Sequence, residues 1–519
     1  MVSKLHSAQV VGLSANHIIV EVDIAKGLHS FAIVGLPDKA IEESKDRISA
    51  AIKNSGFKSP QKSNKKVIVS LAPADLKKEG PVSDLAVAMA YLLAGKEINF
   101  NAEQRLIVGE LALDGSVREI KGALMIARLA KRAGFRELYL PRANAAEAAL
   151  IADLTVYPVD TLRQLADHLS PPNPTDELEP PVRQEITPAP ATEIVYTEAH
   201  YPSDMSEIRG QETAKRGLEI AAAGGHNVAM SGPPGTGKTM LAKAFTSILP
   251  PLSFNDILEV TGIHSAAGLL EETLITAAPF RSPHHTSSYV SLVGGGAWPK
   301  PGEITLAHRG VLFLDEFPEF EKRVIEALRQ PLEDRVINVA RARGSLSFPA
   351  DFILIAAMNP CPCGHRGSRG RECVCSPMAL ARYGRKISGP IIDRIDLWLE
   401  VGPIDHEKLA GPTLGESSAS LRARVEGARA RQAARLRAAG REARTNSQLN
   451  TKDLRLLAPL SESSTKLLNE AAKKLDLSAR AYHRIIKLAR TIADLAGDEG
   501  IKDEHLIEAL QYRPRAIAV

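Results

Sequence analysis

A glycine-rich loop with one lysine and one threonine is the stretch of this sequence best suited to do chemistry. It reads Gly232-Pro-Pro-Gly235-Thr-Gly237-Lys238-Thr239, which matches the phosphate-binding pattern G-x-x-x-x-G-K-[ST]. The glycines allow a tight backbone whose N–H groups converge on an anion, and the lysine reaches the β- and γ-phosphates. Because the threonine hydroxyl can also hold Mg²⁺, the loop predicts a site for ATP with Mg²⁺.

Two further polar groups follow apolar runs later in the chain, in the order expected of a site that hydrolyses ATP. Asp315 and Glu316 follow Val-Leu-Phe-Leu, so Asp315 can hold Mg²⁺ through water while Glu316 polarises the attacking water. Asn359 follows a second run and can contact the γ-phosphate or that water. The alternatives are an acidic turn and an ordinary turn at strand ends. We predict Glu316 and Asn359 as catalytic residues, and as nucleotide contacts Gly232, Pro233, Pro234, Gly235, Thr236, Gly237, Lys238, Thr239 and Asp315.

Each of these groups needs a buried strand directly before it. The apolar runs at 228–230, 310–314 and 352–358 are short and continuous, which is typical of strands buried on both faces of a parallel sheet. Residues 239–248 have helical spacing, so the glycine-rich loop lies between a strand and a helix. The sequence therefore predicts a P-loop α/β domain.

Length and composition limit the remaining classes. The chain has 519 residues, enough for three domains, with 44% hydrophobic residues and a formal net charge of +4. Because this charge is small, any nucleic-acid site must be local rather than a global basic field. No apolar run is long enough to span a bilayer, and the first residues lack a signal-peptide core. We expect a cytoplasmic protein with no membrane partner.

Residues 1–168 alternate short strand patterns with helical patterns, which predicts an α/β domain of its own. Its segments Ile33-Val-Gly-Leu-Pro-Asp-Lys and Leu71-Ala-Pro-Ala-Asp-Leu-Lys-Lys-Glu-Gly-Pro resemble the N-terminal domain of ComM-type, magnesium-chelatase-related AAA+ proteins. That domain is similar in fold to the Lon protease catalytic domain (S5 domain 2-like), whose chemistry uses a Ser–Lys dyad. The Lon pattern puts the serine at Val82 and the lysine at Leu124, so we expect a scaffold or docking domain without protease activity.

The resemblance also divides the rest of the chain. A Pro-rich linker at 169–203, typical of a semi-extended spacer, leads into an AAA+ domain at 204–405 and a helical lid at 406–519. The long segment 260–309 resembles the helix-2 insertion of the magnesium-chelatase branch, which points into the central pore. This likeness implies DNA contacts from His284, His285 and Tyr289, with a metal site at the histidine pair as the alternative.

Two β-prone runs at 335–348 flank a short Ala-Arg-Gly turn and predict a hairpin with Arg341 and Arg343 near its tip. In the family that this chain resembles, the corresponding hairpin lines the pore, so both arginines are expected to bind DNA. The alternative is a solvated surface hairpin. A similar choice between DNA contact and a solvated face applies to the arginine-dense helix at 421–444.

The chain has four cysteines, and all lie in one short loop. They form two close pairs, and four thiolates at such spacing suit tetrahedral coordination of a structural Zn²⁺. The alternatives are reduced thiols or redox pairs, and His365 could replace one ligand. The predicted metal ligands are Cys361, Cys363, Cys373 and Cys375.

Two arginines outside the P-loop are assigned by resemblance. Arg394 lies in Pro390-Ile-Ile-Asp-Arg-Ile-Asp, similar to a family segment in which the arginine reaches the γ-phosphate of the neighbouring subunit. The alternative is a local ion pair with Asp393 or Asp396. Arg480 matches the second sensor arginine of the lid and follows a Ser478 N-cap signal, with action within or across subunits left open.

The resemblance covers nearly the whole chain, with its motifs in the expected order. It implies a hexameric, ATP-driven DNA helicase that promotes branch migration in natural transformation. Single-stranded and branched DNA are then the partners, and proteins of homologous recombination are further candidates. A magnesium-chelatase-type ATPase driving metal insertion through a partner is one alternative, although it lacks the Lon-like domain and the four-cysteine loop. An AAA+ protein unfoldase, the other, would need a working dyad or a docking peptidase.

Overall fold

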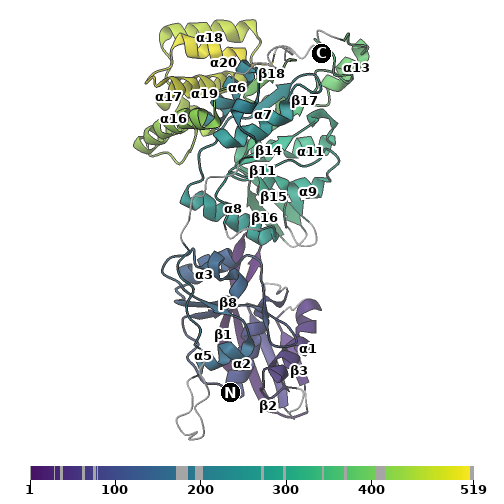
Figure 1. The fold of residues 1–519 in the computed structure, drawn as a ribbon, viewed down its shortest axis with the longest axis vertical. Coiled ribbons are helices and arrows are strands. Elements are labelled where there is room, and N and C mark those ends of the chain that lie inside the picture. Colours follow the sequence, from purple (N-terminus) through teal and green to yellow (C-terminus); the bar gives the residue numbers. More distant parts are fainter. Residues whose placement is uncertain are drawn as a thin grey trace. The chain divides into compact units, whose positions relative to one another are not determined.

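The structure of the chain, a computed structural model, forms two units that are each described by themselves (Figure 1). The first contains Met1–Val195 and Leu258–Ile275, and the second contains Tyr196–Ile257 and Thr276–Val519. The residues that the structure describes are 2–28, 30–35, 39–60, 65–73, 78, 80–170, 185–192, 201, 203–270, 274–295, 300–341, 344–367, 371–403 and 415–514.

A mixed seven-stranded sheet forms the centre of the first unit, in the order β3-β4-β2-β1-β5-β8-β9. The pairs β1·β2 and β2·β4 are antiparallel and the others are parallel. A separate small ribbon pairs β6 with β7. The strands are β1 (Ser3–Val11), β2 (Ser14–Lys26), β3 (Ser30–Val34), β4 (Lys65–Ala72), β5 (Arg105–Ile107), β6 (Glu110–Leu111), β7 (Val117–Arg118), β8 (Glu137–Pro141) and β9 (Thr155–Val159).

Helices cover both faces of this sheet because its strands alternate apolar side chains between two hydrophobic clusters. Leu106 and Leu138 belong to the cluster with α3 and α4, whereas their neighbours Ile107 and Tyr139 belong to the cluster with α1, α2 and α5. The helices are α1 (Lys39–Asn54), α2 (Asp84–Ala94), α3 (Ala123–Arg132), α4 (Ala145–Ala148) and α5 (Leu162–Leu169), with the 3₁₀ turns η2 (Pro81–Ser83) and η3 (Arg142–Asn144).

The two positions where the Lon pattern needs its catalytic pair are apolar and packed. Leu124 is buried in the cluster with α3, and the partly buried Val82 packs against the same cluster. Ser83, one position away, accepts a weak hydrogen bond of 3.4 Å from the Ser7 hydroxyl. The chemistry of a Ser–Lys dyad is therefore absent from these two positions.

Part of the Pro-rich segment is bound to the first unit. Ala189 N donates to the carbonyl of Val156 in β9 at 2.8 Å, Thr192 N donates to Ala149 O at 3.2 Å, and Ile186 is buried. The segment 185–192 has no regular secondary structure and is bonded to β9, the last strand in the order of this sheet. Most of the predicted linker lies outside the described residues.

The second unit contains a parallel five-stranded sheet in the order β11-β14-β17-β10-β18. Its three central strands are buried along nearly their whole length, which confirms the runs predicted at 228–230, 310–314 and 352–358. The strands are β10 (Val228–Ser231), β11 (Phe280–Arg281), β14 (Val311–Leu314), β17 (Ile353–Met358) and β18 (Leu397–Glu400).

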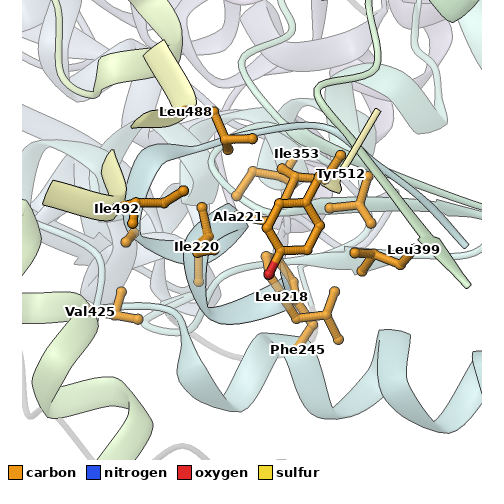
Figure 2. Packing of buried hydrophobic residues seen from close by; sticks show 14 of the residues in the cluster. Leu218, Ile220, Ala221, Phe245, Ile353, Leu399, Val425, Leu488, Ile492 and Tyr512 are labelled. Carbon is orange, nitrogen blue, oxygen red and sulfur yellow. The ribbon is translucent and has the colours of Figure 1, made fainter. Parts of the chain in front are cut away.

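Helices from both ends of this unit share one core with the sheet. Figure 2 shows Leu218 and Ile220 of α6 in the same cluster as Val425 of α16 and Ile492 of α19. The helices are α6 (Glu212–Gly224), α7 (Lys238–Phe245), α9 (Tyr289–Val293), α10 (Glu303–Leu306), α11 (Lys322–Ala327), α12 (Arg329–Asp334), α13 (Pro377–Gly384), α14 (Gly389–Ile392), α16 (Ser418–Ala438), α17 (Thr451–Leu457), α18 (Glu462–Lys474), α19 (Ala479–Ala496) and α20 (Asp503–Gln511), with 3₁₀ turns η4 (Met205–Glu207), η5 (Thr246–Ile248), η6 (Phe317–Glu319) and η7 (Asn446–Gln448). A further helix, α8 (Phe254–Ala267), begins in this unit, and its residues from Leu258 onward belong to the first unit.

Two hairpins project from the chain around this sheet. The first pairs β12 (Gly294–Gly295) with β13 (Lys300–Pro301) and separates the short helices α9 and α10. The second pairs β15 (Val336–Arg341) with β16 (Gly344–Pro349), which confirms the predicted hairpin. Arg343 lies outside the described residues, and for Arg341 the structure describes the backbone alone.

The segment 260–309, predicted as one insertion, is divided between the units. Leu258–Ile275 belongs to the first unit, where Ser265 Oγ accepts a hydrogen bond of 3.0 Å from Gly122 N. The remainder carries β11 and the β12–β13 hairpin in the second unit. The sequence did not predict this division because it depends on tertiary packing of α8.

The arginine-dense helix α16 uses several of its guanidinium groups inside the unit. Arg422 donates to Ser247 O, Arg431 donates to Asp494 O, and Arg435 forms an ion pair of 2.7 Å with Asp494. Gln432 of the same helix donates to Ala223 O at 3.1 Å. These contacts join the helix to α6, α19 and η5, so these side chains are engaged within the unit rather than simply solvated.

Candidate functional site

The glycine-rich loop follows β10 and leads directly into α7, as the sequence predicts. Gly235 and Gly237 have φ angles of 78° and 88°, a left-handed conformation that favours glycine. At Gly232 a Cβ atom would lie 2.0 Å from the carbonyl oxygen of Val401, so a larger residue cannot fit there. The sequence therefore needs glycine at each of these three positions to form this loop.

The Lys238 side chain is buried within the loop. Its Nζ donates to Gly232 O at 2.7 Å, to Pro233 O at 2.8 Å and to Asn359 Oδ1 at 3.4 Å. Burial lowers the pKa of this ammonium group, although Asp315 nearby raises it. A phosphate group here would replace neutral carbonyl partners with a charged one, which strengthens the hydrogen bonds.

Thr239 and Asp315 form the part of the site that fits Mg²⁺. The Thr239 hydroxyl donates to Asp315 Oδ2 at 3.0 Å, so a hydroxyl and a carboxylate lie together at the start of α7 and the end of β14. Mg²⁺ prefers such hard oxygen ligands and usually keeps several waters. These residues fit the cation that accompanies ATP.

Glu316 is held in an unusual backbone conformation directly after Asp315. Its φ of 49° is positive, its N–H donates to Asp315 Oδ1 at 2.9 Å, and its side chain is 55% exposed. His285 Nδ1 lies 3.0 Å from Glu316 Oε2. The imidazole therefore orients the carboxylate that sequence reasoning assigns to the attacking water, a role the sequence did not predict for His285.

The other residues predicted for the insertion lie near this pair. The ring centroids of His284 and His285 are 4.2 Å apart, and the Arg323 guanidinium lies 4.2 Å from the centroid of the Tyr289 ring. His284 is exposed. His285 thus has a carboxylate partner within its own chain, and His284 has an exposed side chain. The DNA contacts expected of both histidines stay predictions.

Asn359 lies at the end of β17, next to Lys238, as predicted. Its backbone carbonyl accepts a hydrogen bond of 3.1 Å from the Tyr383 hydroxyl of α13. The structure thus brings together five predicted residues from two strand ends and the start of one helix: Lys238, Thr239, Asp315, Glu316 and Asn359.

Arg394 and Arg480 lie at a different place. Arg394 Nη1 donates to Pro390 O at 2.7 Å and Nη2 forms an ion pair with Glu333. Arg480 Nη2 lies 3.8 Å from the other oxygen of Glu333. Among the described residues, these are the polar partners of the two guanidinium groups, and none belongs to the P-loop.

The sequence offered Asp393 and Asp396 as local ion-pair partners of Arg394, and neither forms that pair. Asp396 forms an ion pair with Arg484 and lies 3.5 Å from His226 Nδ1. Although burial raises the pKa of Asp396, these two groups hold it well below its usual range. The local ion pair of Arg394 is with Glu333, 61 residues away in the sequence, not with Asp393 or Asp396.

The four cysteines form one cluster. The Sγ atoms of Cys361 and Cys363 are 3.4 Å apart, and Cys373 Sγ lies 3.7 Å from each of them. Cys375 completes a group whose sulfurs all lie within 4.8 Å of one another, without His365. Tetrahedral Zn²⁺ with Zn–S bonds of about 2.3 Å separates its sulfurs by about 3.8 Å, so the four thiols fit this ion.

The cysteine loop also supports the P-loop. A Cβ atom at Gly364 would lie 2.8 Å from Cδ of Pro234, so the two loops are in close contact. Tyr383, which holds the Asn359 backbone, follows in α13 directly after the last cysteine. The cluster therefore lies behind two parts of the predicted ATP site.

Comparison with known proteins agrees with this arrangement. Family models described as magnesium chelatase subunit ChlI match residues 204–409 and 20–144, and the model of the ChlI C-terminal region matches residues 415–513. The chain is 42% identical to the competence protein ComM of Haemophilus influenzae, over 98% of this chain and 97% of the relative. It is 41% identical to the uncharacterized protein YifB of Salmonella typhimurium, over 98% and 96%.

A more distant likeness concerns a protease. The chain is 28% identical to Lon protease 2 of Bacillus subtilis over 196 residues, which is 31% of this chain and 33% of the relative. No helix among the described residues is long and apolar enough to cross a membrane.

Two substitutions separate nucleotide binding from hydrolysis. Lys238→Ala should weaken ATP binding at least about 10-fold because a charged hydrogen-bond donor to phosphate is lost. Glu316→Gln should keep ATP binding but lower kcat about 100-fold or more, because the amide cannot act on the attacking water. Binding by fluorescent nucleotide titration and turnover by phosphate release check both, and wild-type turnover of Glu316→Gln would remove Glu316 from this role.

Proposed function

Because the chain belongs to the magnesium-chelatase-related family of AAA+ ATPases that includes competence protein ComM, we propose that it is an ATP-driven DNA helicase and translocase. It promotes branch migration of recombination intermediates during natural transformation. It works as a ring of identical subunits, expected to be hexameric, on single-stranded and branched DNA. The competence relative, matched over nearly its whole length, supports the biological role, since competence is the uptake of DNA.

The catalytic cycle follows from the site. The P-loop and Lys238 would hold the phosphates of ATP, and Thr239 and Asp315 would hold Mg²⁺, whose charge would stabilise the negative charge on the phosphates. Glu316, oriented by His285, polarises the attacking water. Asn359 lies against Lys238 and so responds to the γ-phosphate.

One observation carries the link from ATP to DNA: the hairpin and the γ-phosphate contact are parts of one continuous stretch. β16 ends at Pro349, β17 begins at Ile353, and Asn359 follows β17. Arg335 and Asp351 form an ion pair that closes the base of the hairpin. A displacement of Asn359 on hydrolysis would therefore be transmitted through the buried strand β17 to the hairpin, whose arginines bind DNA.

The DNA contacts suit a motor that is indifferent to base sequence. Arg341 and Arg343 would bind phosphate oxygens near the hairpin tip, since guanidinium groups pair with phosphate regardless of the base. His284 and Tyr289 of the helix-2 insertion would add contacts from a second loop, beside the β12–β13 hairpin that interrupts α9 and α10.

The position of Arg394 and Arg480 supports their action across a subunit interface. Both share Glu333 as a partner and neither contacts the P-loop among the described residues. Because a ring interface brings one subunit beside the ATP of the next, a shared anchor would present both arginines to the same neighbouring γ-phosphate. Glu333 is 52% exposed, so exchange of this partner for phosphate does not require unfolding.

The prediction that tests the function concerns the hairpin. The purified chain should hydrolyse ATP faster with single-stranded or branched DNA and should unwind a branched substrate. Arg341→Ala with Arg343→Ala should keep basal hydrolysis and assembly, lose unwinding, and reduce the slope of log K against log salt by roughly 1.4, because about two phosphate contacts are lost.

The matched control is Arg455→Ala, which removes one exposed arginine of α17 and should leave unwinding unchanged. ATPase activity that ignores every DNA, with no unwinding, would favour a magnesium-chelatase-type ATPase instead. Unchanged unwinding and salt slope in the hairpin variant would move the DNA grip to the helix-2 insertion.

A second prediction concerns the interface arginines. Arg394→Ala should lower the rate of ATP hydrolysis by about 10³-fold or more, and mixing it with Lys238→Ala chains should restore part of that rate at mixed interfaces. Arg480→Ala should behave in the same way in mixtures. Mixed rings that form, as shown by mass measurement, without any recovery would contradict action in trans.

A third prediction concerns the cysteine cluster. Four thiolates would close the coordination sphere of one structural Zn²⁺ per chain and leave no open position for catalysis. Elemental analysis should find that ion in protein purified without chelators. Removal of the metal should weaken ATP binding, because Gly364 packs on Pro234 and Tyr383 holds Asn359. Metal-free protein with intact cysteines and normal ATP binding would reject the site.

A further inference from the structure

A cavity with several charged residues lies in the ATPase unit, at the amino ends of the strands, whereas the P-loop lies at their carboxyl ends. It has a volume of about 240 Å³, and its wall includes Gly310 and Ile353 at the beginnings of β14 and β17. The P-loop, in contrast, follows the end of β10. Because the strands are parallel, the two sites lie at opposite strand ends, and no part of the proposed catalytic cycle uses this cavity.

The charges that line this cavity do not balance. Four guanidinium groups face two carboxylates, which leaves a formal charge of +2 among the lining residues. Arg309 Nε lies 3.0 Å from Asp256 Oδ1, and Arg309 also pairs with Asp351. The residues in this charged lining are Arg309, Arg335, Arg429, Arg444, Asp256 and Asp351.

Arg429 is the cation with the weakest compensation. Its Nε and Nη2 both donate to the carbonyl of Ala222, at 3.1 and 2.7 Å, and the described residues provide it with no ion pair. Burial lowers the pKa of this guanidinium to about 10, although Asp351 and Asp256 raise it. A neutral carbonyl satisfies two of its donors but leaves its charge unpaired, which favours an additional anion.

We propose that this cavity binds a small phosphate anion among its four arginines, Arg309, Arg335, Arg429 and Arg444. At neutral pH a phosphate monoester carries a charge of about −1.5 to −2, and inorganic phosphate is a mixture of singly and doubly charged ions, so either anion offsets most of the excess of +2. Guanidinium groups bind phosphate oxygens in bidentate geometry. Cavities for drug-sized ligands have about 300–1,000 Å³, so this smaller cavity selects the phosphate group rather than a whole nucleotide.

The cavity joins parts of the unit that the proposed function needs to move. Arg335 immediately precedes β15, Asp351 lies between β16 and β17, and Arg444 lies at the end of the lid segment after α16. Gln448 Nε2 donates to Asp351 Oδ2 at 3.2 Å, and Arg335 Nη2 donates to Ser447 Oγ at 3.4 Å. A bound phosphate would add bonds to both sides and fasten the lid to the base of the β15–β16 hairpin.

Phosphate of this charge has two sources near such an enzyme: the free anion, which ATP hydrolysis releases, and the terminal phosphate of a DNA strand. The test uses full-length protein that carries Lys238→Ala, so that phosphate binding at the P-loop is weakened. Calorimetric titration with sodium phosphate at constant ionic strength, against sodium chloride, measures the first source. Titration with one oligonucleotide in 5′-phosphorylated and 5′-hydroxyl forms measures the second.

In this background Arg429→Gln and Arg444→Gln should each weaken phosphate binding about 10-fold or more, because a charged hydrogen-bond donor is lost. The control is Arg437→Gln, an exposed arginine of α16 whose Nε donates to Ala433 O of its own helix, and its affinity should not change. Arg444 is 44% exposed, so its variant should fold even where Arg429→Gln is destabilised. Phosphate should also slow backbone hydrogen exchange at residues 444–449.

Phosphate binding that only the cavity variants weaken supports the site with the free anion as its ligand. A preference for the 5′-phosphorylated oligonucleotide that these variants abolish supports it with a strand end as the ligand. Absence of both forms of binding, or equal binding by Arg444→Gln and Arg437→Gln, overturns the proposal. None of these measurements depends on DNA unwinding, so the outcome is independent of the helicase proposal.

Discussion

The register of three parallel strands is the constraint on which the ATP site depends. Ser231 of β10 pairs with Met358 of β17, and Leu314 of β14 pairs with Ala356. The residues that follow, Gly232 and Asn359, are therefore neighbours, and Asp315 lies two residues, about 7 Å, short of Asn359 along the sheet. A slip of one residue would turn Asn359 to the other side of β17 and separate it from Lys238. The strand register thus sets the relative positions of Gly232, Asp315 and Asn359.

The cysteine loop and α13 support this end of the sheet. Gly364 packs on Pro234, and the Tyr383 hydroxyl binds the backbone of Asn359, so the cysteine cluster and α13 restrain two sides of the site at once. Such a loop has little apolar surface of its own. Burial of apolar side chains alone cannot keep such a short loop in one conformation. Coordination of a metal by its four cysteines would do so.

Local sequence predicted the groups that lie next to their own strands. The glycine-rich loop, Asp315, Glu316 and Asn359 each follow a buried apolar run, and the β15–β16 hairpin followed from two β-prone segments around a turn. His285 was predicted as a DNA contact, and its contact with Glu316 was not foreseen, because a pairing between residues 31 positions apart is encoded by no local pattern. The same reason hid the Arg394–Glu333 pair and the docking of segment 185–192 on β9. Arginines of α16 looked solvated because composition does not reveal which carbonyl groups a helix will face.

The strands of the ATPase sheet connect the arginine cavity at their amino ends with the predicted ATP site at their carboxyl ends. β17 begins at the arginine cavity and ends at Asn359, and all six of its residues are buried. β14 runs in the same direction, with Gly310 of the cavity wall directly before it and Asp315, a predicted Mg²⁺ ligand, directly after it. Packed interiors are stiff and deform little along a strand, so a displacement at one end appears at the other rather than being absorbed between them. Under the proposed function, a nucleotide at the carboxyl ends of the strands and a phosphate at their amino ends would both bias the position of the β15–β16 hairpin. The hairpin lies between Arg335 and Asp351 of the cavity, directly before β17, which leads to Asn359.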